Sequence, residues 1–303
     1  MFQHLLVPLD GSSLAESSLP YAITLSQALN AAVTLIHIIE HNAPQEIHGD
    51  RHLRQETEAE EYLKQVARQF FPPPLGVRVS THVHTEEVRN VARSISAHAG
   101  EMAPDLIIMC THGESGKFDL MGSIAQQIIG QGKTPILLVQ PGEKPLRAPV
   151  TLQKFLVALD GDPEHEQGLK AAGELAKHMH ASLHLLTVIP TLGTLSGERA
   201  AAGRLLPGAT SAMLDMTEEC TIDYLEEQAA ALRAQGVGAR TTIRRGDPLQ
   251  QILADSQDED LIVLGTHGKA GINAFWAGSV APKIVSQTRL PVLLVPANRA
   301  SAH

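Results

Sequence analysis

The chain has 303 residues, of which 43% are hydrophobic and 19% charged, and its formal net charge is −9 at pH 7. This length suits two domains of ordinary size. The acidic balance argues against the broad basic face that binds nucleic acid or anionic membranes, and no apolar run approaches the roughly 18 residues of a membrane span. Without a basic start to the chain or a disulfide framework, we expect a cytoplasmic protein.

The first half alternates short apolar runs with segments of helical spacing. Runs rich in Val, Ile and Leu are typical of strands that are buried on both faces of a parallel sheet. They predict strands at residues 5–9, 33–39, 77–83, 106–110 and 136–139. The apolar side chains between the first two runs repeat every three or four residues, from Leu19 to Leu29, and therefore predict a helix.

The second half follows the same pattern. Its apolar runs predict strands at residues 155–159, 182–189, 239–244, 261–265 and 292–295. The helical spacing returns from Leu169 to Met179. Connections longer than usual follow the second strand of each half, at residues 42–56 and 191–221, and the latter is rich in Gly, Ala and Ser.

The two halves are copies of one unit, separated by about 150 residues. The end of the first strand reads Leu9-Asp10-Gly11 in one copy and Leu159-Asp160-Gly161 in the other. Alternating strands and helices predict a doubly wound, mostly parallel α/β sheet of five strands in each copy. We predict domains at residues 1–141 and 152–297, joined by a proline-containing linker at 142–151.

A glycine-rich loop follows the fourth strand of the second copy. Gly265 and Gly268 are separated by two residues. Nine further residues separate Gly268 from Gly278-Ser279, which opens the next predicted helix. Glycine lets backbone N–H groups approach phosphate oxygens, and the start of a helix favours the same anion. The spacing is neither that of a Walker A loop nor that of the dinucleotide fingerprint.

This loop, together with the Asp-Gly turn after the first strand and the closing Pro-Val-Leu-Leu-Val, resembles the universal stress protein family (UspA-like) in a tandem form. The resemblance implies an adenine nucleotide α-hydrolase-like fold and ATP, with Mg²⁺ on its phosphates, in the second copy. It implies that Asp160 meets the ribose and adenine, that Val188 lines the adenine pocket and that the phosphates are held by Gly265, Gly268, Gly278, Ser279 and Val280. Asp160 also suits the N-cap of the following helix.

The first copy departs from this pattern. Cys110 stands where the second copy has Gly265, and eight residues instead of nine separate Gly113 from Gly122-Ser123. A side chain at this point obstructs the approach of phosphate to the backbone, so we expect a diverged site. Its equivalent positions are Asp10, Ile38, Gly113, Gly122 and Ser123.

The final strands of both copies are apolar and prone to aggregate if unpaired. In single-copy members of the family they pair across a dimer, so we expect the two copies to pack as an internal pseudo-dimer. Whether whole chains form a homodimer is left open.

The chain has 15 histidines, among them the pair His82 and His84 on one face of a strand. Such pairs bind zinc in some proteins. Without a cysteine or carboxylate at a known spacing, hydrogen-bonded or solvated histidines are the favoured interpretation. Cys110 is similarly expected to pack as a small hydrophobe rather than to act as a redox thiol.

We assign no catalytic residue and predict a stress-response or signalling protein that binds ATP and hydrolyses it slowly or not at all. His267 and Lys269 lie inside the glycine-rich loop and could contact phosphate. The alternatives are a slow ATPase, an ATP pyrophosphatase, and an interaction or ligand-binding protein that no nucleotide regulates. The pyrophosphatase is disfavoured because its Ser-Gly-Gly-x-Asp loop is missing after the first strand.

Overall fold

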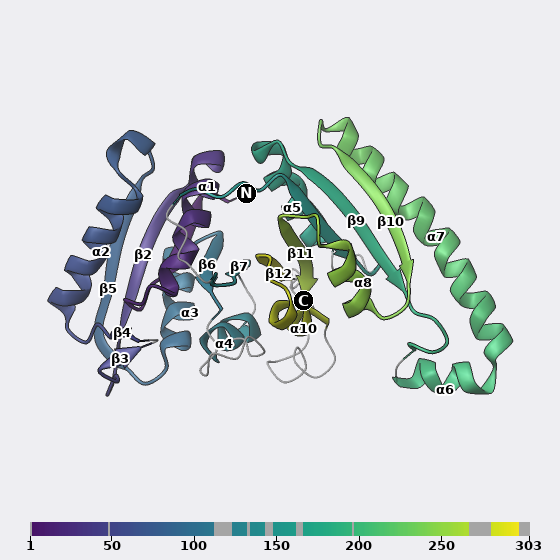
Figure 1. The fold of residues 1–303 in the computed structure, drawn as a ribbon, viewed down its shortest axis with the longest axis horizontal. Helices are drawn as coiled ribbons and strands as arrows, with labels where there is room; N and C mark the ends of the chain where they lie inside the picture. The colour runs from purple at the N-terminus through teal and green to yellow at the C-terminus, as the bar shows by residue number, and fades with distance from the viewer. Residues whose placement is uncertain are drawn as a thin grey trace, which may run out of the picture.

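The computed structural model describes residues 2–47, 49–111, 123–131, 134–142, 148–161, 166–195, 197–266 and 280–296. A single 10-stranded sheet runs through both halves, in the order β10-β9-β8-β11-β12-β7-β6-β1-β2-β5 (Figure 1). The strands of the first half are β1 (His4–Pro8), β2 (Ala32–Glu40), β5 (Val79–Val88), β6 (Leu106–Cys110) and β7 (Ile136–Val139). Those of the second half are β8 (Lys154–Leu159), β9 (Ser182–Ile189), β10 (Ala239–Arg245), β11 (Leu261–Thr266) and β12 (Val292–Pro296).

Helices cover both faces of this sheet. In the first half they are α1 (Leu19–Leu29), α2 (Glu56–Phe70), α3 (Val91–Met102) and α4 (Ser123–Gln131), with 3-10 turns η1 (Ala15–Ser18) and η2 (Pro73–Leu75). In the second half they are α5 (Gln167–Met179), α6 (Gly197–Leu205), α7 (Pro207–Ala234), α8 (Pro248–Asp255) and α10 (Val280–Gln287). Helices α1, α2, α5 and α7 pack on one face, and α3, α4, α8 and α10 pack on the other. This arrangement confirms the doubly wound fold.

Within each half, neighbouring strands are parallel and the chain order repeats. The first strand of each half lies between its second and fourth strands, so β1 separates β2 from β6 and β8 separates β9 from β11. The order of the strands reverses between the first and fourth strands, which is the switch point of the sheet. Ligands of doubly wound sheets bind there, beside the carboxyl ends of the strands.

The two halves join through β7 and β12, the strands that the sequence predicts to need a partner. These strands pair antiparallel, with Leu137 opposite Leu293 at 2% and 1% exposure. Antiparallel pairing of equivalent strands relates the halves as two subunits of a symmetric dimer. The internal pseudo-dimer is therefore confirmed.

The predicted long connections are more regular than the sequence indicates. Residues 42–56 contain a hairpin formed by β3 (Glu46–Ile47) and β4 (Asp50–Arg51). The long connection predicted at residues 191–221 forms α6 and the first part of α7 over most of its length. Ala, Leu, Met and Glu in this segment favour a helix, and α7 buries Leu225, Ala229 and Leu232 against the sheet.

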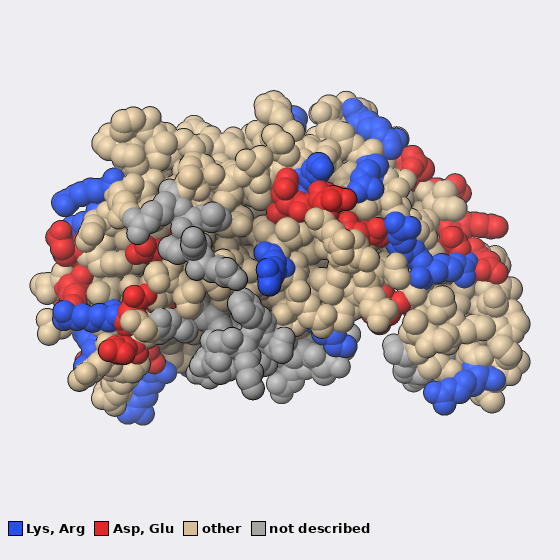
Figure 2. All heavy atoms as spheres, in the orientation of Figure 1, with Lys and Arg blue, Asp and Glu red and all other residues tan. Residues whose placement is uncertain are grey.

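None of the described helices combines the length and apolarity that crossing a membrane requires. On the face drawn in Figure 2, lysine and arginine side chains are interspersed with aspartate and glutamate, most densely over α7 and β10.

The seam between the halves gives a first prediction. Leu293→Ala removes a buried side chain opposite Leu137, and we expect the free energy of unfolding to fall by about 2–5 kcal/mol. Chemical denaturation measures this loss. The matched control is Leu206→Ala, whose side chain is 64% exposed on the surface, and which we expect to change stability by less than about 0.5 kcal/mol. Equal effects of the two substitutions would contradict the importance of the seam.

Candidate functional site

The carboxyl edge of the second half collects three of the predicted site residues. Asp160 directly follows β8, Val188 lies near the end of β9 and Gly265 lies near the end of β11. Since β8 pairs in parallel with both β9 and β11, all three residues reach the same edge of the sheet. Val188 packs against the apolar core on the face that α8 and α10 cover, whereas Asp160 is exposed.

The remaining predicted residues of this site lie around the glycine-rich loop. Val280 is the first residue of α10 and packs against the same core as Val188. The predicted phosphate-binding positions Gly268, Gly278 and Ser279 lie outside the described residues, as do His267 and Lys269.

Helix α5 closely approaches the end of β11. A Cβ atom added to Gly168 would lie 3.1 Å from the backbone nitrogen of Gly265. This separation is tighter than an ordinary van der Waals contact, so the approach depends on glycine at position 168. The start of α5 therefore packs directly against the backbone at the end of β11.

The equivalent edge of the first half brings together Asp10, Ile38 and Cys110. The carboxylate of Asp10 accepts hydrogen bonds from the backbone nitrogen and the hydroxyl of Ser12, at 2.9 and 2.6 Å. Ile38 and Cys110 are 5% and 2% exposed, and burial raises the pKa of the Cys110 thiol far above its usual range. Cys110 is therefore a packed thiol and not a thiolate. Gly113 and Gly122 lie outside the described residues, and Ser123 begins α4 without a described side chain.

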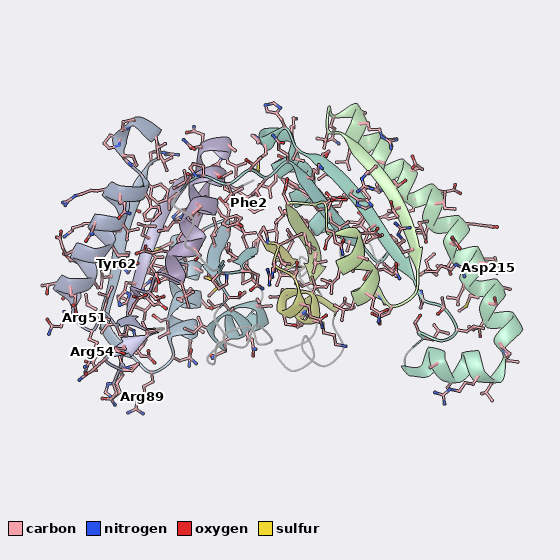
Figure 3. All side chains as sticks on the ribbon, viewed as in Figure 1. Phe2, Arg51, Arg54, Tyr62, Arg89 and Asp215 are labelled. Carbon is pink, nitrogen blue, oxygen red and sulfur yellow. The ribbon has the colours of Figure 1, made fainter. Side chains whose placement is uncertain are left out.

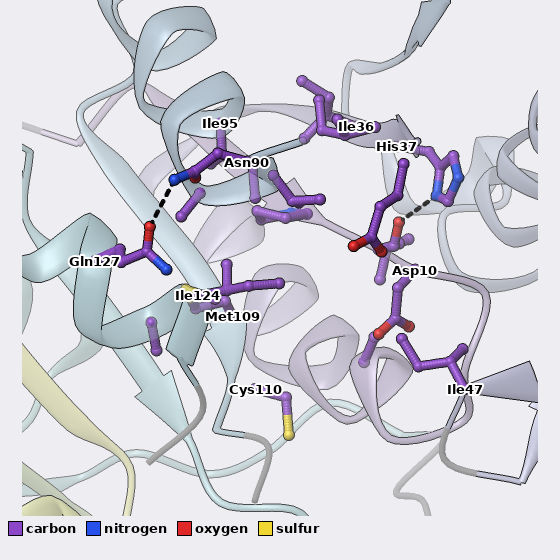
Figure 4. A pocket seen from close by; sticks show the side chains of 18 of the residues that line it. Asp10, Ile36, His37, Ile47, Asn90, Ile95, Met109, Cys110, Ile124 and Gln127 are labelled. Atoms are coloured by element: carbon purple, nitrogen blue, oxygen red, sulfur yellow. Dashed lines mark hydrogen bonds between the residues drawn. The ribbon is translucent and has the colours of Figure 1, made fainter. Parts of the chain in front are cut away.

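A cavity of about 450 Å³ opens at this edge of the first half (Figure 4). Its apolar wall comes from β2, α3, β6 and α4, and its polar wall comes from the ends of β1 and β2 and from the segment after β4. The lining includes Asp10, Ile38 and Cys110, which the sequence analysis identifies, and Glu40, His52, Arg89 and Asn90, which it misses. The position of Glu40 as the last residue of β2 is a signal that could have been used.

Several contacts hold the hairpin and the residues that follow it (46–54) against the strands. In buried His37, Nδ1 lies 2.7 Å from the Leu9 carbonyl oxygen and Nε2 lies 3.1 Å from the Leu53 carbonyl oxygen; a neutral imidazole donates a hydrogen bond to one of the two. Gly11 has a φ of +93°, and a Cβ there would lie 2.8 Å from the side chain of Leu53. Glycine at position 11 is therefore required for both the turn and the packing.

Three histidines lie together at β5, the strand next to β2, and at the helix α3 that covers it. His82 and His84 lie on one face of β5, and the ring centroid of each is 4.9 Å from that of His98 on α3. His98 Nε2 and His84 Nδ1 are 3.0 Å apart and share a hydrogen bond. Among the described residues, no group of three histidine, cysteine or acidic side chains has the geometry of a metal site.

This histidine cluster predicts a pH-dependent stability. Burial lowers the pKa of His82 below 6.5, and His98 and His84 lower it further, while Glu101 opposes the shift. The unfolded chain then takes up a proton at higher pH than the folded protein, so stability falls as the pH drops below about 6.5. We expect Tm to decrease between about pH 7.5 and 5.5 and to decrease less in His82→Gln. The exposed His178→Gln serves as the control, and an unchanged pH profile in His82→Gln would contradict the interpretation.

Comparison with known proteins assigns a family to both halves. The profile described as "Universal stress protein family" matches residues 1–140 and 151–296. A universal stress protein of Bacillus subtilis is 29% identical over 148 residues, which cover 47% of this chain and 97% of that protein. One of Mycolicibacterium smegmatis is 22% identical over 314 residues and covers 96% of both chains. The crystal structure of a universal stress protein from Archaeoglobus fulgidus aligns with a TM-score of 0.67 at 16% identity, covering 97% of this chain and 98% of that one.

Proposed function

Because the chain belongs to the universal stress protein family, we propose that it is a stress-response protein that binds ATP in its C-terminal half. The observation that carries this proposal is the place of the sequence Gly265-x2-Gly268-x9-Gly278-Ser279, which begins at the end of β11 beside the switch point of the half-sheet. Backbone N–H groups at such an edge are suited to phosphate.

The proposed contacts divide by chemistry. Asp160 hydrogen-bonds the ribose and adenine side, and Val188 supplies an apolar wall for the base. The loop glycines, Ser279 and the start of α10 at Val280 bind the phosphates, with Mg²⁺ as their counter-ion. The common edge shared by Asp160, Val188 and Gly265 supports this division.

We propose that ATP acts as a bound ligand more than as a substrate. The sequence offers no obvious base to activate water in the loop, so turnover is slow or absent. Phosphate release measured on the saturated protein tests this point, and a turnover rate of about one per second or faster, typical of enzymes, would contradict it.

Equivalent glycines in the two halves allow a matched test of the site. Gly278→Val places a branched side chain where phosphate approaches the backbone, and we expect it to abolish ATP binding measured by calorimetry on nucleotide-free protein. Gly122→Val makes the same change at the equivalent position of the first half. We expect Gly122→Val to retain the affinity of the unmodified protein, in the micromolar to sub-millimolar range.

The other outcomes of this pair are equally informative. If the unmodified protein does not bind ATP, the proposal fails. If Gly122→Val loses binding and Gly278→Val retains it, the nucleotide site lies in the first half instead of the second.

A further inference from the structure

The first half contains a second cavity, which shares two lining residues with the one beside Asp10. The outer cavity has a volume of about 670 Å³ and a mainly polar lining. Glu40 and His52 are the two described residues that line both cavities. They therefore lie between a cavity with an apolar wall, here called the inner chamber, and one with a polar wall, here called the outer cavity; we refer to Glu40 and His52 as the neck.

Both neck residues carry polar atoms that lack a hydrogen-bond partner. His52 is 4% exposed, and its Nδ1 is buried with no hydrogen bond in the described structure. The carboxylate of Glu40, which is half-buried, likewise receives no hydrogen bond or ion pair from a described residue. A buried unpaired polar atom is costly, and a ligand or ordered water commonly explains it.

Some of the charged side chains near the neck have partners of their own. Arg51 pairs with Glu58 at 2.6 Å and His41 pairs with Glu87 at 2.7 Å. Arg51, Arg54 and Arg89 all lie at this end of the first half (Figure 3). None of these arginines forms an ion pair with Glu40 in the described structure.

The neck has no counterpart in the second half. At the repeat spacing of about 150 residues, Pro190 stands in place of Glu40 and Thr187 in place of His37. No hairpin is present among the described residues that follow β9. The first half therefore has chemistry of its own and is not a weaker copy of the proposed ATP site.

We propose that the first half binds a small organic cation, an amine or guanidine on an apolar body, whose N–H groups donate to Glu40 and to Nδ1 of His52. The carboxylate is an acceptor of hydrogen bonds. Burial lowers the pKa of His52, while the nearby carboxylates of Glu40 and Asp10 oppose that shift. In the neutral tautomer that carries its proton on Nε2, Nδ1 accepts a hydrogen bond as well. Two hydrogen-bond acceptors at the neck favour a ligand that donates hydrogen bonds. The nearby carboxylate of Asp10 adds a second negative charge, which favours a cation.

The inner chamber fits the rest of such a ligand. Its volume lies in the range of small-molecule pockets. Side chains that can contact an apolar body extend from four elements and from the hairpin. They are Ile38, Ile47, Ile95, Met109 and Ile124. The charge of the neck disfavours a triphosphate at this position.

The test uses the full chain and two probes of the same shape. 2-Phenylethylamine is a cation at neutral pH, and 2-phenylethanol is its neutral counterpart. Ligand-observed NMR and calorimetry measure both affinities, and we expect the amine to bind about tenfold or more tightly than the alcohol. Glu40→Gln and His52→Leu should each weaken amine binding by about tenfold. Glu60→Gln on α2, whose side chain pairs with Lys64, is the matched control and should bind normally.

Each contrary result overturns the proposal. These results are no amine binding up to about 10 mM, equal binding of amine and alcohol, or full affinity in Glu40→Gln at an unchanged Tm. The Gly278→Val protein separates this inference from the proposed ATP site, because amine binding there should persist without ATP binding. Displacement of the amine by ATP in that variant would identify the cavity as a nucleotide site instead.

Discussion

The antiparallel contact between β7 and β12 is the constraint on which the rest of the structure depends. Each half ends in a short apolar strand that exposes a row of unpaired backbone groups if it remains an edge. Pairing the two strands removes both edges and buries their side chains, including Leu137 and Leu293. The pairing also continues the core across the seam, since one cluster of buried residues includes side chains from both halves. Two five-stranded units thereby become one sheet.

A fused pair can diverge in a way that a symmetric dimer cannot. In a homodimer, a substitution at one site appears at the other, whereas here positions 40 and 190 change independently. The carboxyl edge of the second half retains the glycine at position 265, and the first half has Cys110 there. The first half instead acquires Glu40, His52 and the hairpin between them. The shared seam keeps the scaffold intact while the two edges differ in chemistry.

The sequence predicts the framework more completely than the sites. Strand positions follow from apolar runs, because burial on both faces leaves few alternatives, and β6, β7 and β9 match their predicted bounds. The sequence does not predict helix α7, because the Gly, Ala and Ser residues in its first turns are also typical of a loop. Packing of its apolar side chains on the sheet stabilises the helix. Asp10 and Ile38 are identified through the family resemblance and the internal repeat. His52 is not, because a hairpin brings it to the cavity and no periodic signal marks that contact. The predicted loop positions Gly268, Gly278 and Ser279 stay predictions.

The hairpin explains how the neck keeps its geometry without a ligand. Asp50 accepts hydrogen bonds from the backbone nitrogen and the hydroxyl of Ser13 at 2.7 and 2.9 Å, and the imidazole of His37 lies between the carbonyls of Leu9 and Leu53. These contacts fix the residues on both sides of His52 while its own Nδ1 remains unpaired. A site whose support is already ordered loses little conformational entropy on binding. The contacts of His37 and Asp50 therefore hold the backbone around His52 in place, and its unpaired nitrogen is the position at which a donor gains most.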